Sequence, residues 1–387
     1  MPSNDDDQFA DIRPYNDNEV PGVITRLKQD RALANNLARL RLPWLHGALP
    51  IVARFLVRRW IAWKLAGVST VEQFQGLVEP QLQMQIDQTA VFSSSGLDAL
   101  SPDASYLFIS NHRDIAMDPA FTNHALYHAG HRTVSIAIGD NLLREQWVAD
   151  LMRLNKSFIV KRNITAPREL LAASRHLAGF IREMITGNRG SVWIAQREGR
   201  AKDGNDATEP AVIKMLSLSQ DRKRETLGEA LATLHIVPVA IAYELDPCDA
   251  AKAAELAAGA GYTKADDEDV LSIGRGIAGQ KGRVHLAFGE PICPSGTDTA
   301  LDVATVVAAI DRHIAKHYQL FECNLWAWQR LEGCEDWPAG LTIQPGTITR
   351  DAFDARIVAL PADHQPLVLA MYANPLRNAL AVSTGAQ

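Results

Sequence analysis

The stretch from residue 106 to residue 119 reads YLFISNHRDIAMDP. Its first four residues are apolar and polar residues bound them, which predicts a short buried strand. This strand would deliver Asn111 and His112 to its carboxyl end. Asp118 and Pro119 then predict the start of a helix, with the aspartate at the cap and the proline at the first helical position.

A histidine and two aspartates therefore share the loop between a strand and a helix. Loops held by a rigid sheet often carry the chemistry of a protein. The imidazole of His112 can take a proton from an alcohol, and a carboxylate beside it would fix its tautomer and stabilise the cation. These residues alone leave open the alternative of a capped turn with a hydrogen-bonded histidine.

This loop resembles the first motif of the glycerol-3-phosphate and 1-acylglycerol-3-phosphate acyltransferase family, in which Asn-His is followed by four residues and then by Asp, often with Pro. Here Asp118 comes one residue later than in the family. Either Asp118 is the partner of His112 across a one-residue insertion, or Asp114 takes that place. The proline after Asp118, as in the family, favours Asp118.

Later stretches repeat the order of the family's motifs. A strand at residues 284–288 followed by Gly-Glu-Pro-Ile is similar to the end of these domains. The resemblance covers residues 106–292. The second, third and fourth motifs are matched by FIVKR at 158–162, WIAQREGR at 193–200 and IVPVAI at 236–241.

The resemblance implies a layered α/β fold with a mixed, mostly parallel sheet flanked by helices. It also implies an enzyme of phospholipid biosynthesis that moves a fatty acyl group from acyl-CoA or acyl-carrier protein to a hydroxyl of a lysophospholipid or glycerol-phosphate acceptor. His112 would be the general base, with Asp118 or Asp114 as its partner. The thioester is a substrate, and we expect no cofactor and no bound metal.

Further residues are implied at the substrate. Basic side chains would hold the acceptor phosphate, backbone amides near Gly199 would stabilise the oxyanion, and Glu198 would orient the basic residues or the acceptor. The implied substrate-binding residues are Asn111, Arg113, Lys161, Arg162, Glu198, Gly199 and Arg200.

Two other functions remain open for the same pattern. The first is a non-catalytic protein that binds a lipid or an acyl group on the same fold, which the displaced aspartate allows. The second is an acyl-thioester hydrolase, in which water replaces the alcohol. Thioester consumption separates an enzyme from a binding protein, and free fatty acid released without an acceptor would indicate the hydrolase.

The chain divides into four expected regions. Residues 1–18 are acidic and predict a disordered tail, and residues 19–95 predict a helical region. Strands alternate with helices over residues 96–295, which predicts the α/β catalytic domain. Residues 296–387 predict a helical C-terminal region.

The segment from residue 42 to residue 68 predicts an amphipathic helix. Large apolar side chains share one face, and Arg54 and Arg58 share another. This pattern is typical of a helix in a membrane interface, while a packed core helix with arginines at its rim is the alternative. A lipid acceptor favours the membrane. The apolar face comprises Val52, Phe55, Leu56, Trp60 and Trp63.

Composition sets outer limits on function. The 387 residues are 47% apolar and carry a net charge of −6, which argues against nucleic-acid binding. Four widely spaced cysteines indicate a reducing compartment, so we expect a cytoplasmic protein peripheral to the inner face of the membrane. The polar N-terminus is not a signal peptide, and no apolar run predicts a transmembrane helix. The sequence makes no prediction of the oligomeric state.

Two patterns in the sequence are expected to carry no chemistry. Residues 274–279, GRGIAG, match a dinucleotide fingerprint by letter but lack its strand–turn–helix context, which predicts a flexible turn in a flexible segment at 246–279. His124 and His128 share a helix face without the glutamate of a metalloprotease motif, which predicts a surface or core-edge helix.

Overall fold

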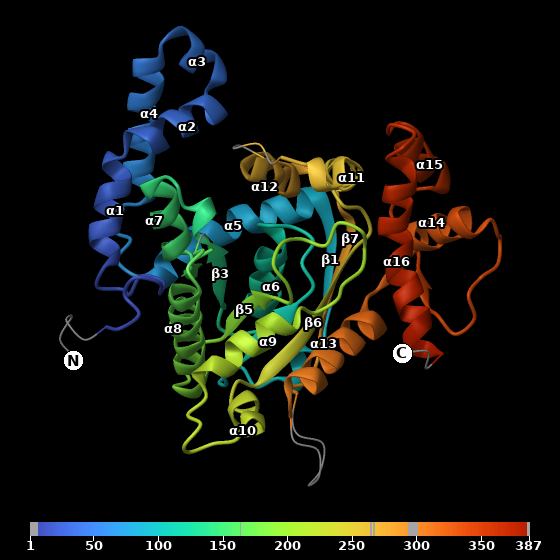
Figure 1. Cartoon of the computed structure of the whole chain (residues 1–387). Coiled ribbons are helices and arrows are strands. Elements are labelled where there is room, and N and C mark those ends of the chain that lie inside the picture. The colour runs from blue at the N-terminus through green and yellow to red at the C-terminus, as the bar shows by residue number, and fades with distance from the viewer. Residues whose placement is uncertain (1–6, 163, 264, 266–267, 293–300, 385–387) are drawn as a thin grey trace. The chain divides into compact units, whose positions relative to one another are not determined.

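The computed structural model describes residues 7–162, 164–263, 265, 268–292 and 301–384 (Figure 1). The chain forms two compact units. Unit 1 comprises residues 1–82 and 135–173, and unit 2 comprises residues 83–134 and 174–387. Unit 2 contains His112 and most of the expected site residues.

Unit 1 is mainly helical, and two helices, α5 and α8, continue from it into unit 2. Its elements are α1 (Val20–Gln29), α2 (Arg31–Arg41), α3 (Pro43–Ala48), α4 (Pro50–Lys64), the first part of α5 (Val71–Thr89), β3 (Ser135–Gly139), α7 (Gln146–Leu154), β4 (Ser157–Val160) and the first part of α8 (Pro167–Thr186). Prolines at the first positions of α3 and α4 divide the segment that we predicted as one helix.

Apolar side chains from several helices form the core of unit 1. Leu27 of α1, Val57 and Ile61 of α4 and Leu154 of α7 belong to one buried cluster. The two strands of this unit, β3 and β4, pair in parallel.

The expected disordered tail is ordered over residues 7–18, and residues 1–6 lie outside the described residues. Phe9 and Ile12 are buried, and the carbonyl of Ile12 accepts the amide of Ile159 at 2.8 Å. Arg13 forms ion pairs with Asp7 and Glu19. Two apolar anchors and one paired arginine therefore order this segment, despite its acidic composition.

Among the described residues, unit 2 contains five strands of one sheet, a separate pair of strands and most of the helices. Its strands are β1 (Ala90–Ser95), β2 (Leu107–Ser110), β5 (Val192–Ala195), β6 (Ile236–Tyr243) and β7 (Gly282–Phe288), and a short pair, β8 (Leu320–Phe321) and β9 (Ile343–Gln344), lies apart from them. Its remaining helices are α6 (Met117–His128), α9 (Pro210–Leu216), α10 (Leu227–Ala232), α11 (Asp249–Ala258), α12 (Glu268–Ala278), α13 (Val303–His317), α14 (Glu322–Glu332), α15 (Arg350–Val358) and α16 (Gln365–Ser383).

The sheet of unit 2 has the strand order β1-β7-β6-β2-β5. The pairs β1–β7, β6–β2 and β2–β5 are parallel, and β6–β7 is antiparallel. Every residue of β2 and β6 is buried, as expected for central strands of a parallel sheet covered by helices. Helix α13 packs on β6 and α6 packs on β7. The predicted α/β fold with a mixed, mostly parallel sheet is confirmed.

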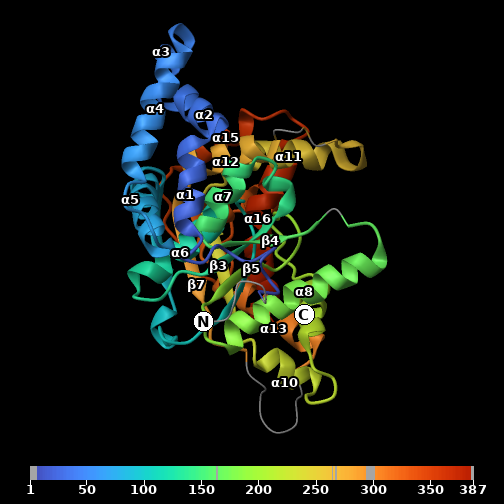
Figure 2. The ribbon, with the colours of Figure 1, turned by 90° about the vertical axis from the view of Figure 1, so that its left-hand side faces the viewer.

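The described residues of the segment at 246–279 are not a flexible insertion, because they form helices α11 and α12, and residues 264, 266 and 267 lie outside the described residues. Lys252 of α11 and both Ser272 and Gly276 of α12 are buried, so this segment is part of the fold. Figures 1 and 2 show the two helices adjacent to each other. The glycine-rich turn predicted at 274–279 is therefore mostly helix.

The C-terminal helices α14, α15 and α16 share one apolar cluster with α11 and β6. Phe353, Leu376 and Tyr372 are among its buried members. Among the described helices, none has both the length and the apolar character needed to cross a membrane.

Candidate active site

The candidate site lies where three parallel strands of unit 2 end. Because β5, β2 and β6 run in parallel, their carboxyl ends lie at one edge of the sheet. The loop after β2 carries His112, and the loop after β5 runs to Ala201. The amide of Ala201 donates to the carbonyl of His112 at 2.8 Å, so the two loops are in contact.

His112 is held by a buried carboxylate. Its Nδ1 lies 2.8 Å from Asp118 Oδ2, and its side chain is 13% exposed while that of Asp118 is fully buried. The same Oδ2 accepts the amides of Arg113 at 2.6 Å and Asp114 at 2.9 Å. A carboxylate at Nδ1 selects the tautomer with its proton on that nitrogen, which leaves Nε2 as the basic atom.

Asp114 precedes helix α6 and binds the backbone at the start of that helix. Its Oδ1 accepts the amides of Ala116 at 2.9 Å and Met117 at 2.8 Å, so the helix starts at Met117. The predicted start, with Asp118 as the cap and Pro119 first, is wrong by two residues. Because Asp114 satisfies these amides, Asp118 sits inside the first turn and its carboxylate turns back to His112.

Asp114 is also enclosed by a neighbouring helix. A Cβ added to Gly276 of α12 would lie 1.9 Å from Asp114 Oδ2, so only glycine leaves room for the carboxyl group. Burial, followed by the nearby charge of Asp118, raises the pKa of Asp114. The neutral form of this side chain is therefore favoured relative to an exposed aspartate.

Asn111 and Arg113 are bound within the protein. The Asn111 side chain pairs with the backbone of Ile241, accepting its amide at 2.7 Å and donating to its carbonyl at 2.9 Å. Arg113 Nη2 donates to Asp206 Oδ2 at 2.6 Å, and Asn111 donates to the same oxygen at 3.1 Å. Both side chains are buried, and their expected contact with substrate stays a prediction.

The far side of the loop rests on a buried ion pair. Lys252 Nζ donates to the carbonyl of Arg113 at 2.8 Å and pairs with Asp246. Burial alone would raise the pKa of Asp246, but the ammonium of Lys252 outweighs burial and lowers it. This pair fixes the peptide between Arg113 and Asp114 from the side of α11.

The third motif reaches the same edge of the sheet. The ring of Trp193 packs edge-on against His112, with centroids 5.8 Å apart. Glu198 and Gly199 are exposed, and Gly199 has a left-handed backbone (φ 73°). Arg200 Nη2 lies 3.4 Å from Ser272 Oγ, while its buried Nη1 has no hydrogen-bond partner among the described residues. The motif thus brings exposed backbone and an arginine to the loop of His112.

Lys161 and Arg162 belong to unit 1. Lys161 pairs with Asp11 at 2.8 Å, and the amide of Arg162 donates to Asp140 Oδ1 at 3.2 Å. Their expected role toward the acceptor phosphate stays a prediction.

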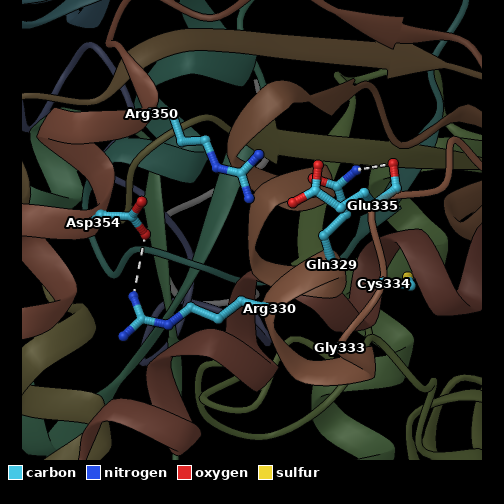
Figure 3. Close-up of a pocket in the computed structure, with 7 residues that line it drawn as sticks. All are labelled: Gln329, Arg330, Gly333, Cys334, Glu335, Arg350 and Asp354. Carbon is cyan, nitrogen blue, oxygen red and sulfur yellow. Dashed lines mark hydrogen bonds and ion pairs between the residues drawn. The ribbon is translucent and has the colours of Figure 1, made fainter.

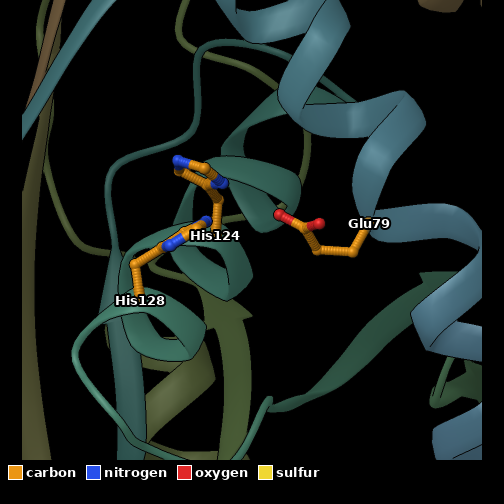
Figure 4. A group of neighbouring side chains, drawn as sticks. All are labelled: Glu79, His124 and His128. Atoms are coloured by element: carbon orange, nitrogen blue, oxygen red, sulfur yellow. The ribbon is translucent and has the colours of Figure 1, made fainter.

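Two other groups of neighbouring side chains lie outside the loop of His112. His124 and His128 lie one turn apart on α6, with ring centroids 4.3 Å apart (Figure 4), and Phe92 packs edge-on against His124. Glu79, also labelled there, belongs to unit 1. A pocket of about 320 Å³ in the C-terminal helices (Figure 3) contains Arg330, which pairs with Asp354 at 3.1 Å. None of the expected site residues lines it.

Sequence reasoning missed three residues that hold the loop, namely Tyr243, Asp206 and Lys252. Tyr243 ends the strand of the fourth motif and donates to Asp118 Oδ1 at 2.8 Å. Its place at the end of a buried strand is a signal that could have been used. Asp206 and Lys252 lie in segments without a recognisable pattern, so only the folded chain brings them to the loop.

Comparisons with known proteins agree with the motifs. The sequence model of the acyltransferase family matches residues 92–242. No curated protein sequence is significantly similar to the chain. The crystal structure of the 1-acyl-sn-glycerophosphate (LPA) acyltransferase PlsC from Thermotoga maritima is similar with 14% identity and a TM-score of 0.34, over 73% of this chain and 94% of that one. Residues 92–242 are thus similar to the acyltransferase family, which confirms the resemblance drawn from the motifs.

Proposed function

We propose that the chain is an O-acyltransferase that moves a fatty acyl group from acyl-CoA or acyl-carrier protein to a hydroxyl of a lysophospholipid or glycerol-phosphate acceptor. One observation carries the proposal: a partly exposed imidazole held at 2.8 Å by a buried carboxylate, at the edge where three parallel strands end. The match of residues 92–242 to the acyltransferase family supports the reaction class.

The reaction proceeds by direct transfer. His112 Nε2 takes the proton of the acceptor hydroxyl while Asp118 stabilises the imidazolium. The hydroxyl oxygen attacks the thioester carbonyl and forms a tetrahedral intermediate. The carbon–sulfur bond then breaks, the new ester forms, and the proton on Nε2 passes to the departing thiolate. His112 returns to its neutral form, and no covalent enzyme intermediate is needed.

The third motif supplies the remaining groups. We assign oxyanion stabilisation to backbone amides near Gly199, where an exposed left-handed turn leaves the backbone accessible. Arg200 has a buried guanidinium nitrogen without a partner among the described residues, which suits an incoming phosphate oxygen. The resemblance of their motif also assigns Lys161 and Arg162 to an acceptor phosphate, and Glu198 to orienting basic side chains or the acceptor.

We also propose that α3 and α4 of unit 1 bind a membrane surface. The buried residues of α4 are Ala53, Val57 and Ile61. The large apolar residues of the predicted face therefore lie mostly outside this buried stripe. Trp44 is 82% exposed and Trp63 is 68% exposed. Residues 31–71 contain arginines and a lysine but no aspartate or glutamate, although the chain as a whole is acidic. This combination favours an anionic lipid surface.

The test of the activity is His112→Ala in the full-length protein. The assay supplies palmitoyl-CoA with lysophosphatidate, lysophosphatidylglycerol or glycerol 3-phosphate and measures thioester consumption and acylated product. The variant should lose acyl transfer while its unfolding temperature stays within a few degrees of the wild type. His128→Ala, an exposed histidine on α6, serves as the matched control and should keep full activity.

Other outcomes would replace the proposal. Turnover retained by His112→Ala would end the base assignment. Free palmitate released by the wild type without any acceptor would indicate a thioester hydrolase. Binding of the thioester or the lysolipid without consumption would indicate a non-catalytic binding protein.

A further inference from the structure

Tyr243 is the last residue of β6, and its hydroxyl is directed into the candidate site. The side chain is 4% exposed, and the hydroxyl donates to Asp118 Oδ1 at 2.8 Å. The other carboxylate oxygen, Oδ2, takes His112 Nδ1 and two backbone amides. Among the residues that the structure describes, Tyr243 is thus the group that engages the second oxygen of the carboxylate.

The position of Tyr243 is fixed from two sides. Its backbone pairs with Val284 in the antiparallel register between β6 and β7. Its ring packs edge-on against Phe121 of α6, with centroids 5.9 Å apart and an interplanar angle of 77°. Phe121 and Asp118 both belong to helix α6. The ring and the hydroxyl of Tyr243 therefore contact two residues of that helix, and they join strand β6 to it beside the carboxylate.

The hydroxyl of Tyr243 can act only as a donor at this site. Burial, and next the charge of Asp118, raise the pKa of Tyr243 well above its usual value. The phenol therefore stays protonated across the pH range in which a histidine titrates. A fixed neutral donor stabilises the carboxylate without adding a competing charge, and it prevents rotation of the carboxylate away from His112.

We propose that Tyr243 is a positioning residue for acyl transfer, which holds Asp118 and through it sets the orientation and basicity of His112. This proposal rests on the proposed role of His112 as the base. Removing the hydroxyl leaves Asp118 Oδ1 without this donor, so more negative charge acts on the imidazole. The cation that forms on His112 is then stabilised relative to the neutral ring.

The test is Tyr243→Phe in the full-length protein, assayed with palmitoyl-CoA and the acceptor that the wild type uses. We expect kcat to fall about tenfold, as for the loss of one hydrogen bond to a charged group, with both KM values within about twofold of the wild type. The acidic limb of the kcat/KM profile should move to higher pH, because the added negative charge on Asp118 favours the cationic form of the base.

Tyr106→Phe is the matched control. Tyr106 is also a buried tyrosine of unit 2, and its hydroxyl accepts the amide of Ser101 at 2.9 Å. It precedes β2, whereas His112 follows that strand. A merely structural role for Tyr243 would make the two variants alike, with lower stability and an unchanged pH profile.

A second substitution keeps the proposal testable if Tyr243→Phe does not fold. Incorporating 3-fluorotyrosine at position 243 preserves the ring and makes the hydroxyl a stronger donor. It should move the acidic limb to lower pH, opposite to the shift expected for phenylalanine. If the variant that folds has the same pH profile of kcat/KM as the wild type, the proposal is overturned. If His112→Ala is inactive while Tyr243→Phe behaves as wild type, the positioning role fails and the proposed function stands.

Discussion

The ammonium of Lys252 lies 2.8 Å from the backbone carbonyl of Arg113, the residue directly after His112. Lys252 is 1% exposed and is paired with Asp246, which is itself buried. Helix α11, which lies in a segment that the sequence predicted to be flexible, therefore supports the loop that carries His112. This contact makes the integrity of the loop depend on a buried pair of opposite charges.

Lys252→Met should destabilise the protein strongly. The substitution leaves Asp246 buried without its cation, and removing one partner of a buried ion pair typically costs about 3–5 kcal/mol. Denaturant titration measures the loss in the free energy of unfolding. Adding Asp246→Asn to the same chain should recover part of the lost free energy of unfolding. The side-chain oxygen of the asparagine can still accept the backbone amide of Cys248, and the asparagine carries no charge. Equal stability of the single and double variants would contradict the ion-pair account.

Asp118→Asn and Asp114→Asn should differ sharply in activity. The asparagine of Asp118→Asn can present its amide nitrogen to His112 Nδ1, which disfavours the required tautomer, so kcat should fall about a hundredfold or more. The asparagine of Asp114→Asn keeps an oxygen for the amides of Ala116 and Met117, so the loss there should stay below about tenfold. Steady-state kinetics of the two variants decide between the aspartates, and the reverse order would reassign the partner.

Gly276→Ala should destabilise unit 2, while Gly274→Ala should not. A Cβ at Gly276 meets the carboxyl of Asp114, and such overpacking costs about 1–3 kcal/mol. A Cβ at Gly274 of the same helix meets nothing within 4 Å, so alanine there should stabilise the helix by about 0.5–1 kcal/mol. Thermal unfolding of both variants tests this contrast. Similar shifts of the unfolding temperature would show that α12 does not enclose Asp114.

Much of the fold could be predicted because local patterns marked it. Strand β2 lies within one residue of the apolar run at 106–109 that predicted it, and all its residues are buried as expected. The sequence did not predict the bounds of helix α16, because Pro375 lies inside the helix and its buried residues follow no single stripe. Helix α12 was missed because its glycines indicated a turn, whereas close packing on Asp114 is what requires Gly276.

Without the resemblance of its motifs, the candidate site could be predicted only where its residues are close in sequence. His112 and Asp118 lie in the same short segment of the sequence, so their pairing could be predicted. Tyr243 and Lys252 reach the same loop from 125 and 139 residues away from their partners. Such contacts depend on strand order and helix packing, which residue spacing does not encode.

The exposed tryptophans of unit 1 should govern membrane binding. Trp44→Ser with Trp63→Ser removes two large apolar groups from a basic surface, and binding to vesicles of phosphatidylcholine with phosphatidylglycerol should weaken about tenfold or more. Cosedimentation measures the change, and higher salt should weaken wild-type binding as well. Trp337→Ser is the control, because Trp337 is 58% exposed but belongs to unit 2. Unchanged binding of the double variant would exclude these helices as the contact.

His313 should make stability depend on pH in a definite window. It lies on α13 with Nε2 3.0 Å from the carbonyl of Ala287, and burial, with the nearby charges of His317 and Lys316, lowers the pKa of His313 to about 4. An unfolded histidine has a pKa of about 6.5, so between these values the unfolded chain binds a proton that the folded chain does not. This contribution to stability is present above a pH of about 6.5 and is lost as the pH falls toward about 4.

His313→Gln removes this titration while glutamine can still donate to Ala287. The free energy of unfolding of the wild type should therefore fall more steeply than that of the variant between about pH 6.5 and about pH 4. After discounting for the partial exposure of the ring, the extra loss should be at least about 1 kcal/mol. Denaturant titrations at several pH values measure the difference directly. Parallel curves for the two proteins would mean that His313 takes up its proton as readily in the folded state as in the unfolded chain.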